Sequence, residues 1–226
     1  MVNLRTLTAE FIGTLGLVFI GAGAVVTDAA RDGAVGLLGI ALAHALVFAI
    51  MVTATMRISG GHLNPAVTFG VWLANRVDAK TAAAYVLTQL VAGLAAAFLV
   101  MALFPQVAGE VVGYGVPRIA VDVDIVEAIL LEAVLTFFLV SAVFGTAVSP
   151  EAPPVGGFGI GLVLLFAIIV GGPLTGAALN PARAFGPALV AGEWTGHATY
   201  WIGPLLGGAV AAFLWGKILL PAGSEQ

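Results

Sequence analysis

The chain has 226 residues, of which 61% are hydrophobic and only 9% are charged. Soluble domains have about 25% charged residues, so this chain has too few charges to cover a surface that faces water. The composition disfavours a soluble enzyme, a nucleic-acid-binding protein and a disordered chain, and it indicates an integral membrane protein. The net charge of −4 indicates no particular partner, and the absence of cysteine excludes disulfides and cysteine-ligated metal sites.

Long segments without charged residues predict the membrane-spanning helices, each of which needs about 20 apolar residues. These segments are 11–27, 33–56, 58–75, 81–109, 133–150, 152–182 and 194–216. Glycines and polar residues at the start of 58–75 leave room only for a short helix after Pro65, and the end of 152–182 has the same character. The sequence therefore predicts an all-α membrane protein with six transmembrane helices and two re-entrant half-helices.

The orientation follows from the basic residues, which are more frequent in cytoplasmic loops. The first apolar segment is not expected to be a cleavable signal peptide, because Glu10 lies inside its start and the segment reaches spanning length. With the N-terminus cytoplasmic, five of the eight Lys and Arg residues lie inside, namely Arg5, Arg57, Arg76, Lys80 and Lys217. We therefore expect a multi-pass protein of the cell membrane (plasma or inner membrane) with both termini cytoplasmic.

The two regions with short helices are copies of one another. Residues 59–70 and 175–186 are identical at seven of twelve positions, and the likeness extends to Glu10 and Glu132, each followed by a threonine four residues later. We interpret the chain as a single transmembrane domain, 1–226, with repeat one at 5–104 and repeat two at 127–220. Each repeat has three spans, an odd number, so the second enters the membrane from the opposite face. This inverted-topology repeat makes the half-helices meet at their N-termini.

Each half-helix is predicted to begin at an Asn-Pro-Ala motif. Asn is a strong N-cap, Pro suits the first helical position, and Ala is small enough for two helix ends to approach each other. The motifs are Asn64, Pro65 and Ala66, and Asn180, Pro181 and Ala182. Irregular backbone at membrane depth is tolerated where it is buried in protein or lines a watery cavity. We therefore expect pore-lining carbonyls at Gly60, Gly61 and His62 on one side and at Gly176, Ala177 and Ala178 on the other.

The meeting of the two half-helices has an electrostatic consequence. Each N-terminus carries roughly +0.5 of an elementary charge, so a desolvated cation at the meeting point is repelled. The amides of Asn64 and Asn180 are expected to donate into the lumen, so a passing water accepts through its oxygen. Its hydrogens then point away along the pore, which interrupts proton transfer. The paired motifs predict a passage for neutral solutes that excludes ions and protons.

The paired motifs, Arg183 directly after the second motif, and the Glu10/Glu132 pair resemble the aquaporin (major intrinsic protein) family over nearly the whole chain. The resemblance implies a passive water channel in the lipid bilayer, assembled as a homotetramer in which each subunit has its own pore. We expect no enzymatic activity, cofactor, metal or nucleic-acid partner. The resemblance also implies a narrow selectivity filter formed by His44, Ile168, Ala177 and Arg183.

The filter residues are similar to those of plant tonoplast intrinsic proteins. Ile168 and Ala177 are apolar and Ala177 is small, so we expect a wider constriction than in strict water channels. Permeability to ammonia, hydrogen peroxide and urea is therefore expected besides water. Glycerol facilitators typically have Asp after the arginine of the second motif, where this chain has Ala184.

Glu10 and Glu132 are expected to brace the re-entrant loops by accepting backbone N–H groups, in preference to relaying protons or ions. Two alternatives remain open for the function of the chain. One is a facilitator of glycerol or small polyols. The other is an ion-coupled secondary transporter, which also fits an inverted repeat with broken helices. The convergent positive helix ends oppose a coupling-ion site.

Overall fold

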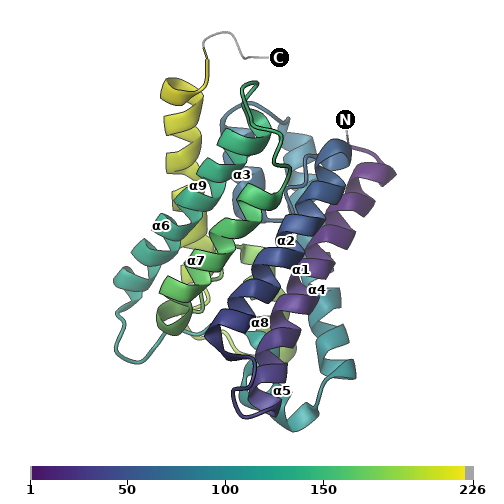
Figure 1. Ribbon diagram of the computed structural model, residues 1–226, viewed down its shortest axis with the longest axis vertical. Coiled ribbons are helices and arrows are strands. Elements are labelled where there is room, and N and C mark those ends of the chain that lie inside the picture. Colours follow the sequence, from purple (N-terminus) through teal and green to yellow (C-terminus); the bar gives the residue numbers. More distant parts are fainter. Residues whose placement is uncertain (1, 222–226) are drawn as a thin grey trace.

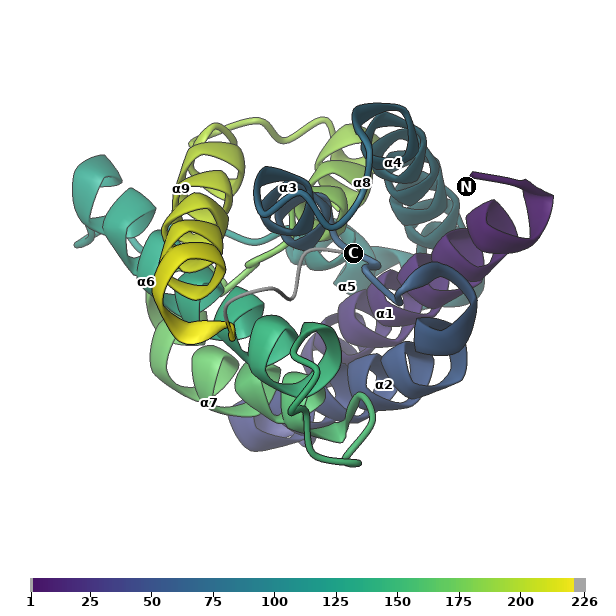
Figure 2. The same ribbon diagram turned by 90° about the horizontal axis from the view of Figure 1, so that it is seen from above.

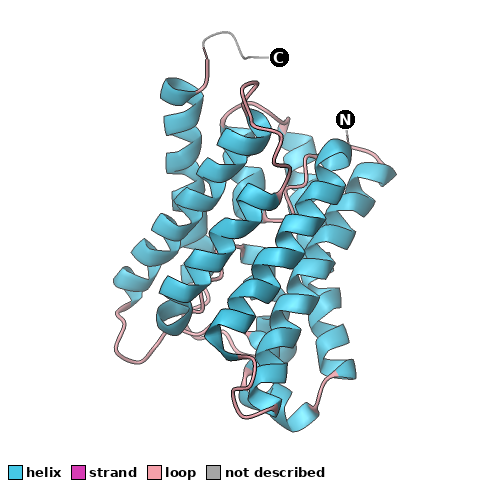
Figure 3. Ribbon diagram, in the orientation of Figure 1, coloured by secondary structure: helices cyan, strands magenta, loops and turns pink. Residues whose placement is uncertain are grey.

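The structure of the protein, a computed structural model, describes residues 2–221, and every regular element within them is helical (Figure 3). Six helices are long and apolar enough to cross a membrane. They are α1 (Leu4–Ala30), α2 (Gly36–Ser59), α4 (Ala79–Leu103), α6 (Ile125–Val143), α7 (Phe158–Thr175) and α9 (Thr199–Leu214). π-Helical turns at Phe144–Val148 and Trp215–Leu219 extend α6 and α9. The predicted domain 1–226 reaches Met1 and residues 222–226, which lie outside the described residues.

Two short helices, α3 (Pro65–Leu73) and α8 (Pro181–Ala191), lie between the spans at the predicted positions. Figure 2 shows α3 and α8 between the long helices α9 and α4. Helix α1 begins and α9 ends at the same end of the bundle, while the short helix α5 (Gln106–Val111) lies at the other end (Figure 1). The predicted fold of six spans and two half-helices is confirmed.

Each half-helix packs against a long helix from the other half of the chain: α3 against α9, and α8 against α4. Glycines permit both contacts. In the first contact, a Cβ on Gly70 of α3 would lie 3.1 Å from the Gly208 carbonyl oxygen of α9. In the second, a Cβ on Gly186 of α8 would collide with the backbone of Gly93 of α4. Lipid tails are as apolar as leucine, so close packing rather than exclusion from water holds such helices together. These contacts hold the two halves of the chain together in one bundle.

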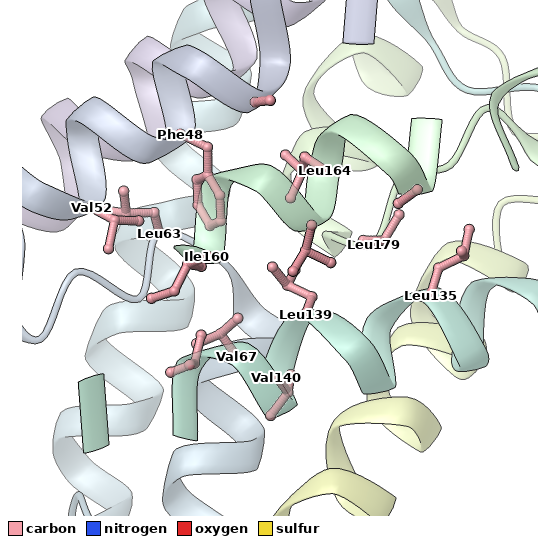
Figure 4. Packing of buried hydrophobic residues seen from close by; sticks show 14 of the residues in the cluster. Phe48, Val52, Leu63, Val67, Leu135, Leu139, Val140, Ile160, Leu164 and Leu179 are labelled. Carbon is pink, nitrogen blue, oxygen red and sulfur yellow. The ribbon is translucent and has the colours of Figure 1, made fainter. Parts of the chain in front are cut away.

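An apolar cluster lies at the centre of the bundle between α2, α6 and α7. Figure 4 shows the side chains of Phe48, Leu139, Leu164 and Leu179 gathered there. Each is at most 7% exposed. Because these four side chains also reach the bundle axis, they form the apolar wall of the site described below.

The connection between α4 and α6 contains helix α5 and a tight turn. Gly113, Tyr114 and Gly115 all have positive φ angles of 53°, 51° and 84°. The Tyr114 side chain is buried in a cluster with Ala22 of α1. Residues 112–120, which we name the strap, thus lie against α1, and Ala120 N donates to the Leu174 carbonyl oxygen of α7 at 2.8 Å.

Candidate pore

Three cavities follow one another along α2. The first, which we name the Arg118 vestibule, has a volume of about 270 Å³ and is lined by Ile40 and His44 of α2. The central cavity has a volume of about 10 Å³ and is lined by His44 and Phe48. The third, which we name the His62 vestibule, has a volume of about 240 Å³ and is lined by Ser59. Because these residues succeed one another along a single helix, the cavities lie along one path through the bundle. The central cavity is close to the minimum volume for one water molecule, so this path narrows to molecular width at its centre.

Both half-helices begin at the central cavity, which Asn64 and Asn180 line. The Asn64 side-chain oxygen accepts from Ala66 N at 2.8 Å, and the Asn180 oxygen accepts from Ala182 N at 3.0 Å and Arg183 N at 3.2 Å. Each asparagine is thus the N-cap of its half-helix, and a proline takes the first helical position. The positive ends of both helix dipoles face the same narrow cavity.

The amide groups of the two asparagines cross between the re-entrant loops. Asn64 Nδ2 donates to the Leu179 carbonyl oxygen, and Asn180 Nδ2 donates to the Leu63 carbonyl oxygen, both at 2.9 Å. The two leucines have positive φ angles of 52° and 51°, which direct their carbonyls toward the opposite asparagine. The sequence predicts that these amides donate into the lumen. One N–H of each amide ties the two loops together, and each amide has a second N–H besides.

Glu10 of α1 lies behind the first re-entrant loop and is fully buried. One carboxylate oxygen accepts from His62 N at 3.0 Å and Ser59 Oγ at 2.6 Å, and the other accepts from Leu63 N at 2.7 Å. Gln89 of α4 donates to the same carboxylate at 2.8 Å. Gln89 was not among the residues predicted from the sequence, although an amide within a spanning helix is a signal that could have indicated it.

Glu132 of α6 has the equivalent position behind the second loop and is also fully buried. It accepts from Ala178 N at 2.9 Å, from Leu179 N at 2.8 Å and from Thr175 Oγ1 at 2.8 Å. These bonds supply acceptors to backbone groups that no helix or sheet satisfies. The same device therefore holds both irregular segments at the depth of the half-helix ends.

The four residues expected to form the filter meet between the central cavity and the Arg118 vestibule. His44, Ile168 and Arg183 line both cavities, and Ala177 lines the central one. Arg183 is 5% exposed, and its Nη1 donates to the Gly115 carbonyl oxygen of the strap at 2.7 Å. Gly115 was not predicted from the sequence, because every residue has a backbone carbonyl and the residue type does not show which one will accept a hydrogen bond.

His44 is held by its own helix. Its Nδ1 is 2.9 Å from the Ile40 carbonyl oxygen, and because a carbonyl only accepts, Nδ1 carries a hydrogen. The other ring nitrogen, Nε2, is buried and has no hydrogen-bond partner. The ring is therefore fixed against the bundle at the level of Arg183.

The expected pore-lining backbone is divided among the three cavities. Gly60 and His62 line the His62 vestibule, Gly176 lines the Arg118 vestibule, and Ala178 lines the central cavity. Gly61 lines none of these three cavities. It packs against α2 instead, where a Cβ on Gly61 would lie 3.1 Å from the Val52 carbonyl oxygen. The two loops thus contribute to the whole length of the path.

Comparison with known proteins agrees with this architecture. The family described as major intrinsic protein matches residues 1–215. The chain is 41% identical to aquaporin TIP4-4 of Zea mays (98% of this chain, 89% of the relative) and 38% identical to aquaporin TIP2-1 of Arabidopsis thaliana (97% and 89%). The X-ray structure of the aquaglyceroporin from Plasmodium falciparum superposes with a TM-score of 0.81 over 95% of this chain and 96% of that one, at 24% identity. This last likeness concerns the fold alone.

The protein is a multi-pass membrane protein by the length and composition of its six spans. The expected location in the plasma or inner membrane receives no support from the relatives, because the plant proteins are of the tonoplast, or vacuolar, type.

Proposed function

The chain belongs to the major intrinsic protein family, and we propose that it is a passive water channel that excludes ions and protons and also admits small neutral solutes. The members of this family are channels rather than enzymes, and the relatives at 35–42% identity are named aquaporins. Ammonia, hydrogen peroxide and urea are the additional solutes that we propose.

The observation that carries this proposal is the meeting of two half-helix N-termini at the narrowest point of the path. Asn64 and Asn180 line a cavity with room for about one water. Each offers a free N–H there, while Phe48, Leu139 and Leu164 offer no polar group. A water that accepts from both amides cannot also accept a proton along the file. The helix dipoles raise the energy of a cation at the same point.

The filter, between the central cavity and the Arg118 vestibule, would select solutes by size and charge. Arg183 is a fixed cation that repels other cations and donates to a water or carbonyl oxygen. Ile168 and Ala177 form an apolar wall that accepts a solute wider than water. His44 completes the constriction. Glu10 and Glu132 hold the loops and take no part in transport.

We also propose that the whole chain forms one channel domain, with repeats at 5–104 and 127–220, and that four copies assemble with one pore each. Many large apolar side chains are exposed on the long helices, for example Leu38, Ile50 and Phe213. Such faces suit both lipid and a second copy of the chain. Both termini lie on the cytoplasmic side in this proposal.

Stopped-flow light scattering on proteoliposomes tests the function. Under a sucrose gradient the wild-type vesicles should shrink much faster than bare lipid vesicles, and a urea gradient should then reveal urea entry. Arg183→Val should preserve water flux and raise proton leakage by about tenfold, equivalent to about 1.4 kcal/mol of barrier. Arg31→Val, which removes an exposed arginine, is the matched control and should behave as wild type.

Each contrary result has a distinct meaning. Water flux no faster than bare lipid contradicts the channel and favours the ion-coupled transporter. Glycerol flux above urea flux favours the polyol facilitator, despite Ala184. Fast water flux without urea or ammonia flux restricts the protein to water alone.

A further inference from the structure

Gly21 of α1 lies beside the His44 ring at a point where a side chain would not fit. A Cβ added to Gly21 would be 2.5 Å from His44 Cδ2 and closer still to Nε2. Carbon atoms in favourable contact are about 3.5–4.0 Å apart. The missing side chain therefore leaves a notch in α1, and the His44 ring occupies this notch.

The notch faces the pore. Leu17, four residues before Gly21, lines the central cavity, and Val25, four residues after it, lines the Arg118 vestibule. Residues four apart share one face of a helix, so Gly21 lies between them on the pore-facing side of α1. The internal repeat agrees with this placement. Gly21 lies eleven residues after Glu10, and Val143 lies eleven residues after Glu132, so the two positions correspond in the repeat. Val143 lines the His62 vestibule.

The notch also determines what His44 presents to a solute. Nδ1 donates to the Ile40 carbonyl oxygen, and the buried Nε2 is turned toward Gly21. Nδ1 already has a partner and Nε2 is buried against α1, so neither nitrogen is presented to a molecule in the passage, although His44 lines the cavities on both sides. Among the four filter side chains, Arg183 is then the one that offers hydrogen bonds to the solute.

We propose that Gly21 is a specificity-determining residue: by receiving the His44 ring, it keeps the constriction wide enough for neutral solutes larger than water, such as urea. A side chain at position 21 would displace the ring away from α1 and into the passage beside Arg183. The inference rests on the proposed channel function and adds a fifth residue to the filter, on a helix that contributes none of the other four.

Urea and water permeability of purified protein in proteoliposomes test the proposal. Gly21→Ala should lower urea permeability by about tenfold and water permeability by only about twofold, because the larger solute meets the displaced ring first. Gly16→Ala is the matched control on the same helix, since its Cβ would meet Met51 at an ordinary distance of 3.4 Å. It should leave both permeabilities unchanged.

A second background separates the notch from a general effect of alanine in α1. With His44→Ala present there is no ring to displace, so adding Gly21→Ala should change urea permeability by less than about twofold. An equal loss of urea flux in both backgrounds would overturn the proposal, as would urea flux through Gly21→Ala equal to that through Gly16→Ala. If Gly21→Ala fails to fold and the double variant folds, the steric coupling is supported; if neither folds, Gly21 is structural and the proposal is wrong.

The wild-type protein distinguishes this inference from the function on which it rests. Absence of water flux would contradict the channel itself. Water flux without urea flux would leave the channel intact and contradict the wide constriction that we assign to Gly21.

Discussion

At the scale of single residues, Glu132 supplies hydrogen-bond acceptors to backbone N–H groups that lie outside any helix. Its two carboxylate oxygens accept from two backbone N–H groups and one hydroxyl of the second re-entrant loop. A carboxylate is suited to this role because both of its oxygens accept, whereas an amide has only one acceptor oxygen.

We expect Glu132→Gln to destabilise the protein and to reduce water flux. The substitution leaves one buried N–H without an acceptor, at a cost of about 1–3 kcal/mol. The midpoint of thermal unfolding in detergent should fall, and the half-helix end should lose its fixed position. Glu110→Gln, at an exposed glutamate of α5, should leave the midpoint unchanged. Equal midpoints for the two variants would contradict the bracing role.

His197, before α9, is expected to make the stability of the protein depend on pH. Trp201 Nε1 donates to His197 Nε2 at 3.1 Å, which requires an unprotonated nitrogen. Burial lowers the pKa of His197 below its usual value. The unfolded chain therefore takes up a proton at a higher pH than the folded protein does, and stability is lost as the pH falls below about 6.5.

We expect the unfolding midpoint to drop between pH 7.5 and 5.5, and His197→Gln to reduce this drop, because a glutamine oxygen can still accept from Trp201. The measurement is a series of thermal unfolding curves in detergent for both proteins. A pH dependence that is unchanged in the variant would show that other groups cause it.

At the scale of elements, the strap contacts half-helix α8 near both of its ends. At the start of α8, the Gly115 carbonyl accepts from Arg183, and beyond its end Arg118 forms a bidentate pair with Glu193, with both N–O distances 2.8 Å. Arg118 also donates to the Val111 carbonyl oxygen at 2.9 Å. The ion pair is partly exposed, so it contributes about 1 kcal/mol or less to stability. Its importance lies in where it holds the strap.

We expect Arg118→Gln and Glu193→Gln each to change the ratio of urea to water permeability by about twofold, because the Gly115 carbonyl is then less firmly held against Arg183. The double variant should show no more than the effect of one substitution, since the two side chains act as a pair. Arg31→Gln is the control for loss of an exposed positive charge. Additive effects of the two substitutions would show that the residues act independently.

At the scale of the whole molecule, the complete absence of cysteine predicts resistance to mercury. Mercuric ions bind the thiolate of cysteine most strongly, and no residue of the chain provides one. Water permeability of the purified protein should be unchanged by mercuric chloride in proteoliposomes. Inhibition that a thiol reagent reverses would contradict this prediction.

The four-fold assembly is tested on the same preparation by its mass in detergent. Light scattering with subtraction of the detergent should give four times the chain mass of 22.8 kDa. A monomer that retains water flux in vesicles would contradict the proposed tetramer but not the proposed channel, because the three cavities lie within one chain.

The sequence by itself determined the helices and the place of the half-helices. Runs of apolar residues must match the thickness of a bilayer, and a proline after an N-capping asparagine starts a helix, so both features depend on local chemistry. The repeat between residues 59–70 and 175–186, together with an odd number of spans, determined that the half-helices meet. The expected roles of Asn64, Asn180 and Arg183 depend on that same pattern.

Only the tertiary structure decided the contacts that have no local signature. The packing of α3 on α9 and of α8 on α4, the bond from Arg183 to the Gly115 carbonyl and the notch at Gly21 each join segments far apart in the chain. A backbone carbonyl or a missing side chain looks the same in sequence wherever it lies. Its effect depends on which distant group lies against it in the folded chain. The width of a passage between helices likewise depends on the distances between them, which no single segment determines.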